Sequence, residues 1–260
     1  MSYSIAVANQ KGGVAKTTTT FSLGGVFAKQ GYTVLLVDLD SQANLSQACG
    51  VNIRQVSGSI LDVFYQWASL TAVSRETGIR GLDIVPSHPG MELAERFLPI
   101  RKNYQNILQT ISQRWLGYDF VIFDCPPSLG AVTLNALNAS DLLLAPVSPE
   151  VFSVEAIKNV QALSAQVQAT SNPKLLLRFL VTMLDNRLRI HRDIVEQLNT
   201  HYADCLFSTR IQVDTRLRES FAANLPVNYY APHSRSTLQY QALAEEIYQD
   251  AREVLSKPAE

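Results

Sequence analysis

Residues 11–18 read Lys-Gly-Gly-Val-Ala-Lys-Thr-Thr, and this stretch decides the fold. An apolar run at 5–8 precedes it and a helix-like run at 21–28 follows, so the segment predicts a strand, a glycine-rich turn and a helix. Such a unit directs backbone N–H groups and the positive end of a helix at one point, which suits phosphate. We therefore expect a nucleotide-binding loop, and its contacting residues are Lys11, Gly12, Gly13, Val14, Ala15, Lys16, Thr17 and Thr18.

The loop departs from the common P-loop pattern in two ways. It fits the variant K-G-G-x-G-K-S/T, except that Ala15 stands where the variant has glycine. The Cβ of alanine disfavours an unusual backbone angle at that position. We expect Lys16 to reach the β- and γ-phosphates of ATP, and the Thr17 hydroxyl to hold Mg²⁺. Lys11 is the second departure, because an ordinary P-loop does not require a second cation.

Length and composition predict one large α/β domain. The chain has 260 residues, of which 47% are hydrophobic and 17% charged, and its net charge is −1. We expect the domain to span residues 1–255, followed by a frayed tail at 256–260. The near-zero charge provides no global field toward nucleic acid or membrane, so any such binding requires a local patch.

The cysteines and the apolar runs predict a cytoplasmic protein. Three widely separated cysteines without a CxxC pair argue for a reducing compartment and against a zinc or iron–sulfur site. The N-terminal segment has no signal-peptide pattern, and no apolar run approaches the roughly 20 residues that cross a bilayer. We therefore expect no membrane partner.

Strand-like apolar runs alternate with helical patterns along the whole chain. The strand-like runs lie at 33–37, 82–86, 120–123, 142–145 and 175–181. The helical patterns lie at 103–115, 153–169, 189–202 and 238–255. Near-continuous apolar strands are typical of a sheet buried on both faces. The alternation predicts the α/β class: a doubly wound, mainly parallel sheet with helices on both faces.

Acidic residues follow two of these strands. Asp38 and Asp40 come at the end of the run at 33–37, and Asp124 follows the run at 120–123. In a parallel sheet, ligands bind at the carboxyl ends of the strands. Asp124 has the position of a Walker B carboxylate, which holds Mg²⁺ directly or through water. Asp38 and Asp40 are two residues apart, so their side chains point the same way in an extended segment, where one supports the metal shell and the other orients the attacking water. The expected metal-binding set is Thr17, Asp38 and Asp124.

Three motifs together resemble a known family. Residues 11–18, 37–42 and 121–128 look like the deviant Walker A, A′ and B motifs of the ParA/MinD (SIMIBI) ATPases. The resemblance continues through 146–150, 181–187 and 228–232, and so covers nearly the whole chain. It is closest to the short ParA/Soj partition proteins.

The resemblance implies a function for each motif. ATP closes a sandwich homodimer in which Lys11 reaches the phosphates bound to the partner subunit. Asp40 positions the water, so the expected catalytic residues are Lys11, Lys16 and Asp40. Met183 and Pro232 lie near adenine. The expected cofactors are ATP and Mg²⁺, and basal hydrolysis is slow until a ParB-like or other cargo adaptor protein stimulates it.

A late cluster of arginines predicts where DNA binds. The cluster contains Arg187, Arg189, Arg192, Arg210, Arg216 and Arg218, with acidic residues interspersed. Short ParA proteins bind DNA non-specifically as the ATP dimer, and Arg187 and Arg216 match positions that the family uses. We expect Arg187, Arg189, Arg216 and Arg218 to contact DNA phosphates without reading bases, which places the protein on the nucleoid. The cargo is a plasmid, a chromosome or a large protein assembly.

Four alternatives stay open at this point. A MinD-like regulator of division needs a basic amphipathic tail, whereas the helix at 238–255 is acidic. An iron–sulfur carrier needs a cysteine motif that the chain lacks. A metabolic ligase of the same superfamily, which couples ATP to carboxylate activation, has the same motif spacing. A nucleotide-dependent binding module differs from an ATPase only in releasing no phosphate.

Overall fold

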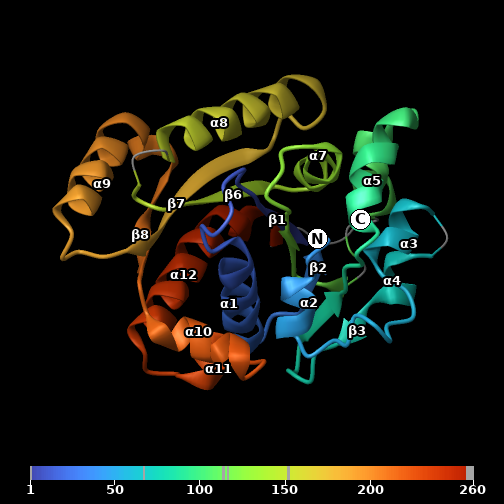
Figure 1. Ribbon diagram of the computed structural model, residues 1–260, viewed down its shortest axis with the longest axis horizontal. Helices are drawn as coiled ribbons and strands as arrows, with labels where there is room; N and C mark the ends of the chain where they lie inside the picture. The colour runs from blue at the N-terminus through green and yellow to red at the C-terminus, as the bar shows by residue number, and fades with distance from the viewer. Residues whose placement is uncertain (1, 67, 113–114, 116, 151–152, 256–260) are drawn as a thin grey trace.

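An eight-stranded, mainly parallel sheet forms the centre of the protein (Figure 1). The computed structural model describes residues 2–66, 68–112, 115, 117–150 and 153–255. The strands follow the order β3-β4-β2-β5-β1-β6-β7-β8, and within these ranges only β3 pairs antiparallel, with β4. Their bounds are β1 (Tyr3–Val7), β2 (Val34–Asp38), β3 (Arg75–Glu76), β4 (Leu82–Val85), β5 (Phe120–Asp124), β6 (Leu142–Val147), β7 (Leu176–Leu184) and β8 (Leu206–Gln212).

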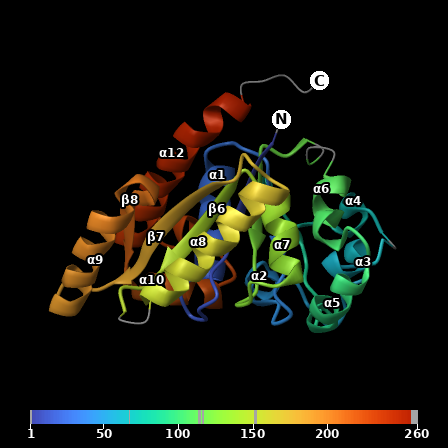
Figure 2. The same cartoon turned by 90° about the horizontal axis from the view of Figure 1, so that it is seen from above.

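Helices cover both faces of the sheet, which confirms the predicted fold class (Figures 1 and 2). One layer consists of α1 (Lys16–Lys29), α2 (Asn44–Ala48), α10 (Thr215–Ala222), α11 (Val227–Tyr230) and α12 (Arg235–Leu255). The other consists of α3 (Ile60–Phe64), α4 (Leu70–Val73), α5 (Met91–Phe97), α6 (Ile107–Ile111), α7 (Ala131–Asn138), α8 (Ser153–Thr170) and α9 (Arg189–Tyr202). The 3₁₀ turns η1 (Leu98–Ile100), η2 (Tyr104–Asn106) and η4 (Ala203–Cys205) belong to this second layer.

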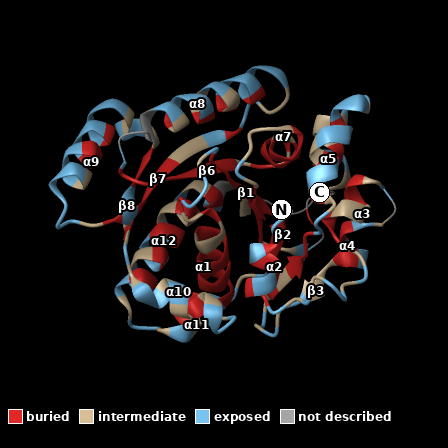
Figure 3. Ribbon diagram, in the orientation of Figure 1, coloured by how far each residue is buried: buried red, intermediate tan, exposed pale blue. Residues whose placement is uncertain are grey.

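Alternation along the strands gives each face its own apolar core. In β1, Ile5 and Val7 belong to the core that contains residues of α1 and α12, whereas Ala6 belongs to the core that contains residues of α7 and α8. Figure 3 shows buried strands between helices whose outer surfaces are exposed. Both sides of the strands are therefore covered, as their near-continuous apolar sequences predict.

Several element bounds differ from the predictions. α9 has its predicted bounds, α8 ends one residue later than predicted, and α12 begins at Arg235, earlier than predicted. The prediction of one helix at 103–115 is wrong, because the described part of this segment forms only η2 and the short α6. Asn103 and Trp115 both have positive φ angles, 57° and 55°, which an α-helix does not permit. β8 was not predicted at all. The predicted tail at 256–260 lies outside the described residues.

The register brings three strand ends together. Val7 of β1 and Asp38 of β2 both lie beside Asp124 of β5. The turn between β1 and α1 therefore lies at the same sheet edge as these carboxylates, as expected for a parallel sheet. Among the described helices, none has the length and apolar character needed to cross a bilayer.

Candidate functional site

The glycine-rich turn contains two left-handed residues. Gly13 has a φ of 74°, and Ala15, the residue that precedes α1, has a φ of 65° and a ψ of 33°. Glycine adopts this conformation without steric cost, but the Cβ of an alanine there lies too close to the backbone. Ala15 is thus the strained position of the turn, at the residue where the sequence departs from the motif.

The N-terminus of α1 opens into a cavity of about 450 Å³. No side chain caps this helix, and its first turn contains no acidic residue, so its free N–H groups and dipole favour an anion. The residues that line the cavity come from the turn and the start of α1, from the segments that follow β2 and β5, from β7, and from the stretch that runs from the end of β8 into α10. They are Gly12, Gly13, Ala15, Lys16, Thr17, Thr18, Asp40, Gln42, Asn44, Pro127, Met183, Ile211, Gln212, Val213, Asp214, Leu217 and Arg218.

Lys16 is the buried cation of this cavity. Its ammonium group donates to the carbonyl oxygen of Lys11 at 3.1 Å, and only 8% of the residue is exposed. Burial lowers the pKa of Lys16, while the nearby charge of Asp124 opposes that shift. The lysine therefore lies beside the helix N-terminus, where it can meet phosphate oxygens.

Asp124 provides a buried carboxylate with a free oxygen. Its Oδ2 atom has no hydrogen-bond partner among the described residues, and the Thr20 hydroxyl lies 3.4 Å from its Oδ1. Burial raises the pKa of Asp124 well above its usual value and the charge of Asp38 raises it further, while the nearby Thr17 hydroxyl lowers it. An unpartnered carboxylate oxygen beside a threonine hydroxyl fits Mg²⁺, which prefers such oxygen ligands.

Asp38 has a different environment from Asp40. Oδ2 of Asp38 accepts hydrogen bonds from the backbone N–H and the hydroxyl of Ser46, at 2.8 and 2.7 Å, and its Oδ1 accepts from the N–H of Asp40 at 3.1 Å. Burial raises the pKa of Asp38 to about 7, against the opposing effect of the Ser46 bonds. Asp38 is fully buried and does not line the cavity, whereas Asp40 does. Through its hydrogen bond with the N–H of Asp40, Asp38 positions the segment that carries Asp40.

Lys11 is not among the residues that line the nucleotide cavity. Its ammonium group forms an ion pair with the Glu150 carboxylate and lies 3.4 Å from the Ser148 hydroxyl. The bond from Lys11 is the main cause that lowers the pKa of Glu150. Asn9 connects the turn to β6, because its side chain donates to the carbonyl of Pro146 and accepts from the N–H of Lys11. The two lysines of the turn thus have different environments, because Lys16 lines the cavity and Lys11 pairs with Glu150.

The far side of the cavity differs in part from the expected adenine contacts. Met183, with a φ of 54°, lines the cavity, but Pro232 is not among the lining residues. The segment from β8 into α10 provides a wall that sequence reasoning missed. Its Asp214 caps α10 by accepting from the N–H of Arg216, a signal that the Asp-Thr-Arg sequence contains.

Three of the four arginines predicted to bind DNA form ion pairs at the surface. Arg187 binds Asp185 at 2.7 Å, Arg189 lies 3.6 Å from Asp193, and Arg216 lies 2.8 Å from Glu219. The fourth, Arg218, is exposed and lines the nucleotide cavity. The cluster is therefore accessible, but neighbouring carboxylates cancel much of its charge.

The fold and the turn define a P-loop nucleotide-binding domain, and residues 2–177 match the AAA domain family. The chain is 34% identical over 245 residues to the sporulation initiation inhibitor protein Soj of Bacillus subtilis, covering 94% of this chain and 97% of that protein. It is 31% identical over 260 residues to the chromosome partitioning protein ParA of Caulobacter vibrioides, covering 98% and 97%. Cobyrinic acid a,c-diamide synthase from Mycobacterium smegmatis, solved with ADP and magnesium, has a TM-score of 0.84 at 30% identity, covering 97% and 96%. The chain belongs to the ParA/Soj family of partition ATPases.

Proposed function

We propose that this chain is an ATPase that ATP switches from monomer to sandwich homodimer. The observation that carries the proposal is that only one of the two lysines in the turn lines the nucleotide cavity. Lys16 lies in the cavity beside the helix N-terminus, whereas Lys11 lies outside it against Glu150. Lys11 belongs to the same turn but does not line the cavity of its own subunit. Its charge is therefore available to a second subunit.

Within one subunit, the residues fit a magnesium nucleotide. The N-terminus of α1 and Lys16 would bind the triphosphate, and Thr17 and Asp124 would hold Mg²⁺, with Asp38 behind them as support. No three His, Cys, Asp or Glu side chains converge on a metal site within the described ranges. When bound, Mg²⁺ neutralises charge that develops on the transferring phosphoryl group.

Hydrolysis requires both subunits in this proposal. Asp40 lines the cavity and orients the attacking water, and Lys11 of the other subunit adds positive charge at the γ-phosphate. Because one cation is missing from each isolated site, monomer turnover is slow. Dimer formation and catalysis then respond to the same ligand, ATP.

The ATP dimer binds DNA through its exposed arginines and responds to a cargo adaptor. Arg187, Arg189 and Arg216 are exposed, and a dimer joins two such surfaces. Contacts between arginines and the phosphates of the DNA backbone do not depend on base sequence, and they retain the dimer on nucleoid DNA in the cytoplasm. A ParB-like adaptor on a plasmid, chromosome or protein assembly stimulates hydrolysis and releases the dimer from DNA.

The mass of the ATP-bound protein tests the switch. We expect light scattering after size exclusion to report a monomer without nucleotide and with ADP, and a dimer with ATP and Mg²⁺. Lys16→Ala, which removes the phosphate contact, should stay monomeric. A wild-type protein that binds ATP tightly but stays monomeric at every concentration contradicts the proposal.

A metabolic ligase is the second candidate, and one finding favours it. The similar structure with 30% identity is a cobyrinic acid a,c-diamide synthase. A ligase that activates a carboxylate has no need of DNA, so co-sedimentation with DNA separates the two candidates. ATP-dependent retention on DNA supports the partition ATPase. Phosphate release that requires an added carboxylic acid and amine donor, without DNA retention, supports the ligase.

A further inference from the structure

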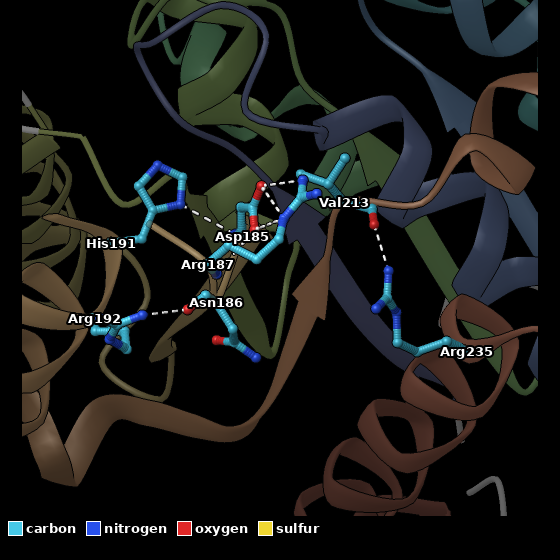
Figure 4. Close-up of polar contacts among 7 residues, drawn as sticks. All are labelled: Asp185, Asn186, Arg187, His191, Arg192, Val213 and Arg235. Atoms are coloured by element: carbon cyan, nitrogen blue, oxygen red, sulfur yellow. Dashed lines mark hydrogen bonds and ion pairs between the residues drawn. The ribbon is translucent and has the colours of Figure 1, made fainter. Parts of the chain in front are cut away.

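A second hollow lies next to the nucleotide cavity. It has a volume of about 380 Å³ and shares Gln212 and Val213 with that cavity. Its walls come from the turn after β7, the end of β8 and the start of α12 (Figure 4). Two arginines, Arg187 and Arg235, are among the residues that line it. The second of these was not among the predicted DNA contacts.

Arg235 is held by a neutral group. It is the first residue of α12, and its guanidinium donates to the carbonyl oxygen of Val213 at 2.6 Å (Figure 4). In the described structure no carboxylate lies within ion-pair distance of it. Asp214 lies near enough to interact electrostatically with Arg235, but its two oxygens accept hydrogen bonds from the N–H groups of Arg216 and Ser236. A bond to a neutral carbonyl orients Arg235, and Asp214 offsets its charge only from beyond ion-pair distance.

Arg187 is oriented by a carboxylate instead. Its Nε and Nη2 atoms donate to the two oxygens of Asp185, at 2.9 and 2.7 Å, in the paired geometry that arginine also uses for phosphate. The turn around this pair is anchored, because Nδ1 of His191 accepts from the N–H of Asp185 and Arg192 donates to the carbonyl of Asn186 (Figure 4). The Arg187 side chain is 88% exposed, so an external anion can reach it.

We propose that Arg187 and Arg235 together bind a backbone phosphate of DNA, and that Asp185 competes with this phosphate for Arg187. The inference rests on the DNA binding proposed above and adds one contact and one competitor to it. Arg235 attracts the phosphate, and Arg187 exchanges its intramolecular carboxylate for the phosphate oxygens. The affinity for DNA is therefore reduced by the free energy needed to separate Arg187 from Asp185.

Arg235→Ala tests the added contact, with Arg252→Ala as the matched control. Arg252 is an exposed arginine near the other end of the same helix, and its guanidinium donates to Gln249 at 3.4 Å. The assay is fluorescence anisotropy of a labelled random-sequence duplex with protein dimerised by ATPγS. We expect Arg235→Ala to weaken binding about 5- to 20-fold at 0.1 M salt and to lower the slope of log Kd against log[salt] by about 2 per dimer. Arg252→Ala should match the wild type.

Asp185→Asn tests the competitor. Asparagine keeps an oxygen that accepts from the backbone N–H of Arg187, and so preserves the turn, but it removes the charge. We expect the variant to bind the duplex about 3- to 10-fold more tightly and with a steeper salt slope. Unchanged or weaker binding overturns the competition.

Separate controls identify which proposal fails. Melting temperature and affinity for a fluorescent ATP analogue should be unchanged in Arg235→Ala. If Arg235→Ala loses ATP affinity but binds DNA normally, the hollow belongs to the nucleotide and the phosphate site is overturned. If Arg235→Ala binds both DNA and ATP normally, the phosphate site is also overturned. If the wild-type ATP dimer binds no DNA, the proposed function itself fails. Inorganic phosphate added at constant ionic strength should compete only weakly, since an isolated ion lacks the neighbouring phosphates of a duplex.

Discussion

The ammonium group of Lys11 is ion-paired with Glu150, a residue 139 positions later in the chain. The two side chains are 29% and 53% exposed, so water and salt screen the pair. Ion pairs of this kind contribute about 0–1 kcal/mol. The pair is therefore weak enough for the phosphates of a second subunit to replace Glu150 as the partner of Lys11.

Removing the charge of Glu150 should favour the dimer. We expect Glu150→Gln to lower the dimer dissociation constant in ATPγS and Mg²⁺ about 2- to 5-fold, because less interaction is lost when Lys11 leaves. Analytical ultracentrifugation measures this constant. Glu155→Gln, at an exposed position on α8, is the control and should behave as wild type. A weaker Glu150→Gln dimer means that Glu150 acts within the dimer and contradicts its role as a competitor.

Ala15→Gly should stabilise the nucleotide-free protein. The residue has a φ of 65°, and glycine removes a left-handed penalty of about 1 kcal/mol, partly offset by its greater freedom in the unfolded chain. The melting temperature should rise by ~1–3 °C. Ala28→Gly makes the same exchange within α1 and should destabilise by ~1 kcal/mol. Equal losses in both variants contradict the strain at Ala15.

Asp124→Asn should stabilise the protein without Mg²⁺ and remove its function. Burial raises the pKa of Asp124 in the folded state. Below about pH 4, the usual carboxyl pKa, Asp124 is protonated in both the folded and the unfolded protein, and the folded protein loses no stability. As the pH rises, the unfolded chain ionises first, and the free energy of unfolding falls. The advantage of the neutral variant should therefore grow from pH 5 to pH 8, toward ~1 kcal/mol or more. Urea unfolding across this range measures it. An advantage that shrinks with pH has the wrong sign and contradicts the account of this carboxylate.

Arg187→Ala and Arg216→Ala should each weaken retention of the ATP dimer on DNA. Both side chains are exposed, and phosphate contacts make binding fall steeply with salt. We expect several-fold weaker retention and a lower salt slope in each variant, measured by co-sedimentation at 50–200 mM salt. Arg54→Ala, an exposed arginine outside the cluster, is the control. If both variants are retained like the wild type, the arginine cluster is not the DNA site.

The sequence was informative where one local pattern determines the geometry. The turn at 11–18 and the acids at the ends of β2 and β5 could be predicted, because the ends of parallel strands meet at one edge. The pairing of Lys11 with Glu150 could not, since it depends on β6 lying beside β1. β8 was missed because it is an edge strand in which polar residues interrupt the apolar run, and with it the cavity wall at Val213 and Leu217. The charge cancellation at Arg187 depends on side-chain geometry that spacing does not reveal.

Complementation between two inactive variants tests the central claim, that Lys11 acts on the nucleotide of the other subunit. Lys11→Ala lacks the crossing cation, and Asp40→Ala lacks the water-positioning carboxylate, so each homodimer should hydrolyse ATP poorly. In a mixed dimer, the Lys11→Ala subunit keeps its own Asp40 and receives Lys11 from its partner, which gives one complete site.

We therefore expect an equal mixture to recover about a quarter of the wild-type ATP turnover, because about half the dimers are mixed and each has one complete site of two. The measurement is phosphate release with DNA present, after the two variants are mixed without nucleotide and ATP is added. Turnover of the mixture equal to the average of the two separate variants, with mixed dimers demonstrated by affinity tags, would contradict the claim.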